Sequence, residues 1–460
     1  MRSRRALLFP GQGAYLSGVL MELADDAAVR DVLETVDLVA RQNGNEPVSP
    51  LLLDAGAVPA DELAGTDPPR AHLAIFATSV ALYRLLTDST DARPDVLLGH
   101  SFGEIAALTA AGALTVEDGA RMVAARDAAC ARRRPPDGGM VSLSAGATRA
   151  GAMLTALGTW EVEVAAVNAP RQTVVSGPEE ELSRVEALAA VAGVRARRLR
   201  APYPFHNRVL RPVAEEYAAG LRDITVRPPA VRVFSAIGLR YYTADDDLRQ
   251  ALASHLTTPV RFADAVRDLY EQGVETFVEC GARSILTDLV GQNLSGVTTH
   301  APLKQRVGAA SAVAAARGGA APAPPPPPVP ATDVPPAPPE AAAPPEATGL
   351  PEATGLPEAT GLPEATGLLP AGLPPRDELM AVLRREYAEA LDYPEDVFSD
   401  DADLDADLGV DSLKQVEMFA RLRNRFGLPA PGADVRVTSF RTLPAVADGL
   451  VRLSSSRATA

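Results

Sequence analysis

Gly99-His100-Ser101-Phe102-Gly103-Glu104 is the stretch around which this sequence is organised. The apolar segment 94–98 before it is typical of a buried strand, and the alanine-rich segment 105–111 after it is typical of a helix. A serine between two glycines at a strand-to-helix turn is the pattern of a nucleophile elbow, because bulky neighbours do not fit so sharp a turn. The serine Oγ is then exposed at the sheet edge, and the next backbone N–H can stabilise an oxyanion. The alternative is a tight junction with an incidental serine.

Composition and charge limit the classes of protein to consider. The chain has 460 residues, 47% of them hydrophobic and 22% charged, which allows two or three ordinary globular domains. The formal net charge of −15 argues against nucleic acid and anionic membranes as partners. No segment approaches the roughly 20 apolar residues of a membrane span, and the apolar run after the basic residues 1–5 is too short for a signal peptide. We therefore expect a cytoplasmic protein.

Cysteines and histidines are scarce. Cys130 and Cys280 are the only two cysteines and form no CxxC pair, so we expect neither a disulfide framework nor a metal site. The candidates for a catalytic base are five histidines, namely His72, His100, His206, His255 and His300.

Residues 1–304 alternate strand-like and helix-like segments, which indicates an α/β domain. Within it, residues 140–199 read strand, helix, strand, strand, helix, strand. This order is the ferredoxin-like pattern, so we predict a small subdomain inserted into the larger one. The larger domain resumes with the apolar strand 231–235 and closes near residue 279.

Residues 305–375 are rich in alanine, proline and glycine and contain four copies of Pro-Glu-Ala-Thr-Gly-Leu that begin at Pro345, Pro351, Pro357 and Pro363. Such a tract buries too little apolar surface to fold alone. A β-helix is excluded because a proline in every repeat removes hydrogen-bond donors. We predict a disordered linker with polyproline character.

Residues 376–455 have the pattern of a small all-α domain. A helix opens at Asp377, an acid-rich loop occupies 400–407, and a second helix begins near Ser412. A short helix over 443–453 completes this unit.

Several motifs in order carry a resemblance to a known family. They are Phe9-Pro10-Gly11-Gln12-Gly13, the elbow, Arg126, Asn168-Ala169-Pro170, Pro204-Phe205-His206, Thr258-Pro259-Val260-Arg261-Phe262 and Gly409-Val410-Asp411-Ser412-Leu413. Residues 4–304 resemble malonyl-CoA:acyl carrier protein transacylases, including the acyltransferase domains of polyketide synthases, and residues 376–453 resemble an acyl carrier protein. The resemblance implies a hydrolase-like α/β core and a four-helix-type carrier domain.

The resemblance implies how the catalytic residues act. Ser101 is the nucleophile and His206 its base, since an alcohol needs activation at neutral pH. The backbone N–H groups of Gln12 and Phe102 form the oxyanion hole. A backbone carbonyl orients the imidazole, and the matching position is His255. By the same resemblance Asn168 belongs to the substrate site, whereas His100 packs around the elbow rather than acting as the base.

Arg126 indicates the class of acyl group. The family places an arginine here to bind the free carboxylate of a dicarboxylic acyl-CoA, and a guanidinium fork matches a carboxylate bidentately. A surface arginine is the alternative. Bulky Phe205 favours malonyl over methylmalonyl, whereas Tyr203 points the other way and Phe102 is unusual beside the serine. We predict a malonyl-type substrate and keep methylmalonyl and hydroxymalonyl open.

Ser412 has no histidine in its own domain to activate it, which favours modification over catalysis. The resemblance implies that it carries phosphopantetheine, attached by a phosphopantetheinyl transferase; a plain helix N-cap is the alternative. The acidic surface suits docking to basic patches.

We therefore expect transfer of a malonyl-type group from CoA to a carrier, fused or on another polyketide synthase protein. A hydrolase that clears stalled carriers and an inactive scaffold are the rival hypotheses. His72 has no physical account from the sequence, in a helix where the family usually carries glutamine.

Overall fold

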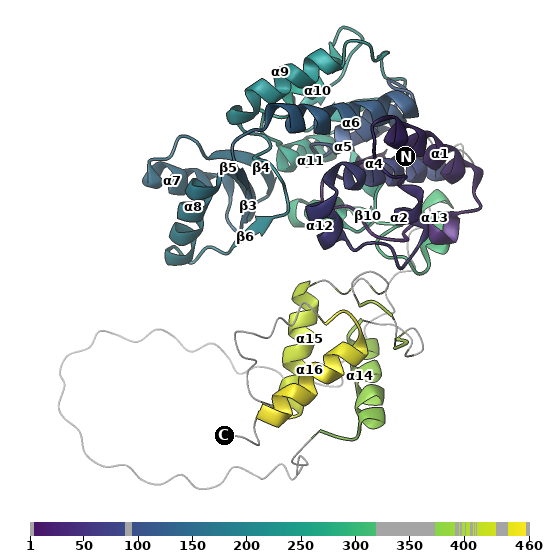
Figure 1. The fold of residues 1–460 in the computed structure, drawn as a ribbon, viewed down its shortest axis with the longest axis vertical. Helices are drawn as coiled ribbons and strands as arrows, with labels where there is room; N and C mark the ends of the chain where they lie inside the picture. Colours follow the sequence, from purple (N-terminus) through teal and green to yellow (C-terminus); the bar gives the residue numbers. More distant parts are fainter. Residues whose placement is uncertain are drawn as a thin grey trace, which may run out of the picture.

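The computed structural model describes residues 4–87, 94–318, 373–391, 395, 398–400, 402–404, 408, 410, 412–428 and 440–456. These residues form an α/β domain with a smaller sheet at one end, and a separate group of three helices near the C-terminus (Figure 1). The predicted linker with its four repeats lies almost entirely outside the described residues. None of the helices in the described part of the chain is long and apolar enough to cross a membrane.

The main sheet is built from short apolar strands, most of them buried on both faces. Five of its six strands are parallel, and the edge strand β8 is antiparallel to β7. Parallel strands covered by helices on both faces read as continuous apolar runs, as the elbow strand does. In spatial order the strands are β10 (Thr298–His300), β9 (Val274–Glu279), β1 (Arg4–Phe9), β2 (Val96–Gly99), β7 (Val233–Ser235) and β8 (Arg240–Tyr241).

Helices pack around this sheet, and among the described helices α4 contributes the largest number of buried residues, because its apolar residues continue around its circumference. The short helices are η1 (Met21–Leu23), α2 (Ser49–Leu53), α3 (Ala60–Thr66), η2 (Arg208–Leu210) and α10 (Leu248–Ser254). The longer ones are α1 (Ala27–Gln42), α4 (Pro68–Thr87), α5 (Gly103–Ala110), α6 (Val116–Arg133), α9 (Arg211–Gly220), α11 (Phe262–Glu271), α12 (Ile285–Asn293) and α13 (Ala309–Gly318).

Helix α13 lies beyond the predicted end of the first domain at residue 304. Its Val313 and Ala316 are buried in the same core as the main sheet, and the helix packs against α4. The α/β domain therefore extends to about residue 318, and the predicted boundary is too early. The composition shifts before the packing ends, because alanines serve a small helix–helix contact as well as they serve a linker.

The smaller sheet has the predicted ferredoxin-like order. Its four antiparallel strands run β4 (Glu163–Ala169), β5 (Gln172–Pro178), β3 (Gly138–Leu143), β6 (Ala196–Leu199), with helices α7 (Ala147–Leu157) and α8 (Glu179–Val191) against it. Strand β4 is also bonded to the main domain, where the Val167 N–H donates to the Val260 carbonyl and the Val260 N–H to the Ala165 carbonyl, both at 2.9 Å. This junction fixes residues 258–260 beside the elbow.

The elbow is a place where backbone meets backbone. A Cβ added to Gly103 would lie 2.0 Å from the carbonyl oxygen of Phe9 in β1, and one added to Gly99 would lie 2.4 Å from the backbone of Glu104. Ser101 between them has a φ of 55°, a left-handed conformation that is rare for a residue with a side chain. Glycine at both flanking positions is therefore a steric requirement.

The C-terminal unit contains α14 (Arg376–Leu391), α15 (Ser412–Arg425) and α16 (Leu443–Ser456). Their apolar faces meet in a core of its own, with Leu383, Phe419 and Leu450 among its buried members. Residues 405–407, within the predicted acid-rich loop, and residues 429–439 lie outside the described part of the chain. Three helices of the predicted four-helix-type unit are thus described.

Replacing Gly103 with alanine should destabilise the α/β domain by about 3 kcal/mol, since β1 cannot move away from a buried Cβ. Gly151→Ala in α7 is the matched control, because a Cβ there meets nothing within 4 Å and should stabilise the helix by about 0.5–1 kcal/mol. Urea unfolding followed by circular dichroism measures both changes. Equal midpoints for the two variants would contradict the steric argument.

Candidate active site

Ser101 and His206 lie together although 105 residues separate them. Ser101 Oγ is 2.6 Å from His206 Nε2, and His206 Nδ1 donates to the backbone carbonyl of Thr258 at 2.8 Å. A carbonyl oxygen can only accept a hydrogen bond, so the ring proton must be on Nδ1. The lone pair of Nε2 then faces the serine. This is the arrangement of a serine nucleophile, its base and an orienting group.

The orienting carbonyl is that of Thr258, so the prediction that His255 supplies it is wrong. The hydrogen bonds between β4 and Val260 fix the segment that holds Thr258, three residues after His255, and the Thr258 carbonyl therefore meets the imidazole. A backbone carbonyl has no sequence signature of its own, and counting from a motif cannot resolve such a shift.

His206 is buried, with 5% of its surface exposed. Burial is the main cause that lowers its pKa to about 3; the bond to Thr258 opposes this shift, and the positive charge of Arg126 contributes a smaller part of it. The imidazole is therefore neutral at pH 7, which is the form that accepts a proton.

His255 has another partner, which the sequence did not indicate. Its Nε2 lies 2.7 Å from Oε2 of Glu104, a carboxylate with no exposed surface in the first turn of α5. The Tyr242 hydroxyl and the Ala236 N–H also donate to this carboxylate, at 3.0 and 3.2 Å. Glu104 therefore ties the elbow helix to the segments after β7 and α10. Its position in the elbow motif is the only sequence signal for it.

The two N–H groups expected to form an oxyanion hole have no acceptor within the described chain. Neither the Gln12 nor the Phe102 backbone N–H donates to another described residue, and Phe102 directly follows the serine. The Gln12 side chain is held by His72, with their Nε2 atoms 2.6 Å apart. Free N–H groups beside a nucleophile suit a developing oxyanion.

Arg126 projects from α6 into the same pocket. Its guanidinium lies over the ring of Phe205, 4.2 Å from its centroid, and 5.5 Å from that of Phe102. Arg126 is 5% exposed, and its Nη1 has no hydrogen-bond partner among the described residues. Its nearest carboxylate oxygen, on Asp127, is 3.8 Å away, beyond hydrogen-bond distance. A buried cation with an unused donor fits an anionic ligand.

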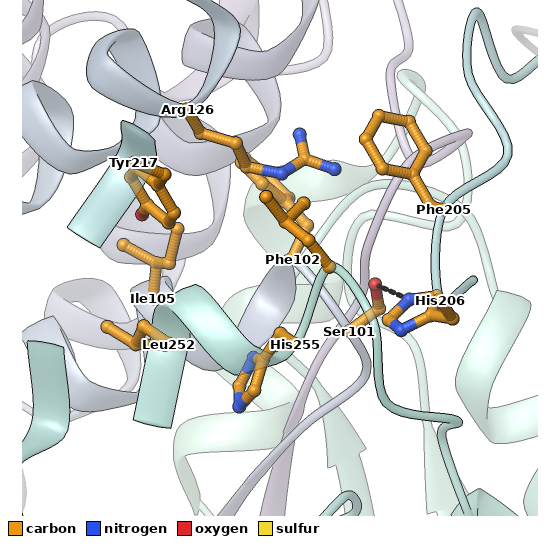
Figure 2. Close-up of a pocket in the computed structure, with 10 residues that line it drawn as sticks. Ser101, Phe102, Ile105, Arg126, Phe205, His206, Tyr217, Leu252 and His255 are labelled. Atoms are coloured by element: carbon orange, nitrogen blue, oxygen red, sulfur yellow. Dashed lines mark hydrogen bonds between the residues drawn. The ribbon is translucent and has the colours of Figure 1, made fainter. Parts of the chain in front are cut away.

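Figure 2 shows the pocket that joins these groups, with the Arg126 guanidinium between Phe102 and Phe205. The pocket is lined by Ser101, Phe102, Ile105, Arg126, Phe205, His206, Tyr217, Leu252, His255 and Leu256. Tyr203 is not among these lining residues; it lies behind Phe205, edge-to-face at 5.9 Å between ring centroids. Tyr203 therefore contacts the lining of the pocket through Phe205.

Asn168 does not line this pocket in the described chain either. Its Oδ1 accepts from His100 Nε2 at 2.8 Å, and its carbonyl accepts from Asn293 at 2.8 Å. The His100 ring also meets Phe262 edge-on, and burial lowers the His100 pKa. His100 and Asn168 therefore join the elbow to the small sheet, which supports the expectation that His100 packs around the turn.

Ser412 is the first residue of α15. All five histidines of the sequence lie at or before His300, so no imidazole belongs to this helical unit. A serine at a helix start without a base fits the attachment of phosphopantetheine through its hydroxyl. No group of three or more metal-ligating side chains occurs in the described part of the chain, and both cysteines are buried and unpaired.

Two families match the chain. Residues 6–316 match the family described as acyl transferase domain, and residues 381–450 match the family described as phosphopantetheine attachment site. The second match covers Ser412, all of α15 and parts of α14 and α16.

Known proteins similar to this chain are of two kinds. It is 33% identical over 297 residues to the phenolphthiocerol synthesis polyketide synthase type I Pks15/1 of Mycobacterium marinum, covering 64% of this chain and 14% of that protein. It is 30% identical over 289 residues to the malonyl CoA-acyl carrier protein transacylase of Haemophilus influenzae, covering 62% of this chain and 90% of that protein. The chain thus spans a small part of such synthases, 13% of NorC of Streptomyces orinoci and 26% of ThaF of Burkholderia thailandensis.

Solved structures agree with this relationship. The acyl-carrier-protein S-malonyltransferase of Burkholderia pseudomallei is 26% identical with a TM-score of 0.62, and the match covers 68% of this chain and 99% of that one. The acyltransferase domain of the second module of the salinomycin polyketide synthase is 32% identical with a TM-score of 0.59, covering 69% of this chain and 77% of that one. This chain therefore belongs to the acyl transferase domain family of enzymes and carries a phosphopantetheine attachment domain at its C-terminal end.

Proposed function

We propose that this protein transfers a malonyl-type acyl group from CoA through an ester on Ser101 to a phosphopantetheine thiol of a carrier domain. One observation carries the choice of acyl group: the buried Arg126 guanidinium has an unused Nη1 donor in the pocket of Ser101 and His206. A malonyl carboxylate supplies the missing partner, whereas a monocarboxylic acyl group would leave a buried cation unpaired.

The first half-reaction uses the geometry of Ser101 and His206. Ser101 Oγ attacks the thioester carbonyl while its proton moves to His206 Nε2, 2.6 Å away. The backbone N–H groups of Gln12 and Phe102 receive the oxyanion. The carbon–sulfur bond then breaks, and His206 returns the proton to the departing CoA thiolate. The products are the Ser101 ester and free CoA.

The second half-reaction runs the same steps in reverse. The phosphopantetheine on the carrier supplies the thiol that accepts the acyl group. His206 Nε2 takes the proton of this thiol, the Gln12 and Phe102 N–H groups hold the second oxyanion, and His206 gives the proton back to Ser101 Oγ. Ser412 is the proposed attachment residue, and a separate phosphopantetheinyl transferase must load it.

Phe205 favours malonyl over its α-substituted relatives. Its ring is 2% exposed, lines the pocket and is held on one face by the Arg126 guanidinium, so it has little room to move away from an α-methyl group. One methylene group changes the relative transition-state binding of two substrates by about 1–3 kcal/mol in such pockets. Methylmalonyl-CoA and hydroxymalonyl-CoA are therefore measured beside malonyl-CoA in the test that follows.

Arg126→Lys should lower kcat/KM for malonyl-CoA about 100-fold, because an ammonium keeps the charge but loses the fork. Arg132→Lys is the matched control, since this exposed arginine of α6 pairs with Glu216 on the protein surface. Intact mass of both domains after incubation with malonyl-, methylmalonyl-, hydroxymalonyl- and acetyl-CoA gives the readout, with Ser101→Ala as the blank.

Three results would overturn the proposal. Acylation by acetyl-CoA and by no malonyl-type CoA would remove the role of Arg126. Unchanged malonyl preference in Arg126→Lys would do the same. Rapid release of free acid without carrier labelling would favour a thioester hydrolase.

The acylation rate should stay nearly constant from pH 7.5 to about 5.5. His206 has a pKa lowered to about 3, so its neutral form persists over this range. With an ordinary pKa near 6.5, only about a tenth of the imidazole would be neutral at pH 5.5, and the rate would fall about tenfold. The unfolded chain binds this proton below about pH 6.5, so the stability from a neutral His206 falls there as pH decreases. Circular dichroism at each pH confirms folding, and a single-proton fall centred near pH 6.5 would contradict the prediction.

The fused carrier should accept the acyl group from its own chain. A flexible tether gives an effective concentration on the order of mM, so at about 1 μM labelling within one chain should exceed labelling between chains by a large factor. The test mixes a Ser101→Ala chain, loaded with phosphopantetheine, with a Ser412→Ala chain. Slow labelling of the mixture, proportional to concentration, is expected beside dilution-independent labelling of the unmodified protein. Equal rates would assign the carrier to partners in trans.

A further inference from the structure

His72 lies between Gln12, which belongs to the proposed oxyanion hole, and Asp127, the neighbour of Arg126. It projects from α4, is 5% exposed and faces the Phe102 ring at 5.6 Å between ring centroids. Its Nδ1 lies 2.9 and 3.0 Å from the two carboxylate oxygens of Asp127, and its Nε2 lies 2.6 Å from Gln12 Nε2. The catalytic steps described above use neither His72 nor Asp127.

These contacts define the proton positions. The Asp127 carboxylate accepts, so His72 Nδ1 carries the proton. The Gln12 side-chain nitrogen donates, so His72 Nε2 accepts. His72 is thus saturated by one acceptor and one donor.

Asp127 is the neighbour of Arg126 in α6 and its nearest carboxylate. Consecutive side chains of a helix do not face each other, but a carboxylate that is free to turn toward a buried guanidinium can reach it with one oxygen and form a charge-assisted hydrogen bond. Here the separation is 3.8 Å, while both Asp127 oxygens face His72 at hydrogen-bond distance. Asp127 therefore compensates the buried charge of Arg126 without occupying its Nη1 donor.

We propose that His72 is a positioning residue that holds the Asp127 carboxylate away from Arg126 and so keeps the guanidinium open to the carboxylate of the acyl group. This inference rests on the proposed function of Arg126. Through Gln12, the same histidine also connects the carboxylate end of the pocket to the oxyanion hole. Substrate affinity and oxyanion geometry thus share one support.

His72→Leu removes both hydrogen bonds and keeps an apolar side chain against Phe102. Asp127 is then free to close on Arg126, so KM for malonyl-CoA should rise about tenfold. Adding Asp127→Asn to His72→Leu removes the competing charge and should return KM to within about threefold of the unmodified protein. His72→Gln, whose amide can donate to Asp127, should keep KM close to the unmodified value. His300→Leu, in β10 outside the pocket lining, is the control for loss of a histidine.

Recovery in the double variant is the decisive outcome, because a purely structural role of His72 would not be repaired by a second substitution. A double variant no better than His72→Leu, or an unchanged KM in His72→Leu, overturns the proposal. A crystal structure of His72→Leu separates this inference from the proposed function: Arg126 and Asp127 should then form a direct hydrogen bond. A distance still near 3.8 Å would refute the positioning role whatever acyl group the enzyme uses.

Discussion

The backbone of the elbow packs directly against the backbone of β1, and the position of the active site depends on this contact. Gly103 lies so near the Phe9 carbonyl that a Cβ would come within 2.0 Å of it, and Ser101 takes a left-handed φ of 55° as the chain turns. This backbone contact lifts the serine above the sheet edge and aims the Phe102 N–H at the same space. His206, in the segment after β6, also has a positive φ, of 62°, and its Nε2 lies 2.6 Å from Ser101 Oγ. Two strained residues thus face each other across a rigid junction.

Three histidines around this junction have different hydrogen-bond partners, and the partners determine the role of each histidine. His255 is paired with the buried carboxylate of Glu104, and His72 with that of Asp127. Among the described residues, the partners of the His206 ring are Ser101 Oγ and the Thr258 carbonyl, and this carbonyl orients the ring without supplying a negative charge. Burial therefore keeps His206 in the neutral form that can accept a proton. His255 and His72 instead hold the carboxylates of Glu104 and Asp127 in place. The partner, rather than the residue type, separates catalysis from support.

The pocket also shows how a cation can be buried and still be available. Arg126 is covered by the rings of Phe102 and Phe205, which offer attraction without hydrogen bonding. Asp127 balances its charge at a distance that leaves Nη1 unused. A guanidinium in this state loses little when a carboxylate enters, because no existing hydrogen bond has to break.

The sequence alone predicted the strand–turn–helix elbow, the inserted ferredoxin-like unit and the helices near Ser412, because each depends on local spacing, turn chemistry or periodicity. It also predicted the meeting of Ser101 and His206, though only through the family resemblance. What it could not determine are pairings made across the fold. Thr258 rather than His255 orients the base, Asn168 serves His100 rather than the pocket, and α13 completes the core beyond residue 304.

The link from His72 to Asp127 likewise depends on how α4 packs against α6, which no local pattern encodes. Steric requirements between neighbouring residues, such as the glycines of the elbow, can be inferred from the local sequence. Hydrogen bonds between distant elements, above all those to backbone carbonyls, exist only once packing has brought the atoms together.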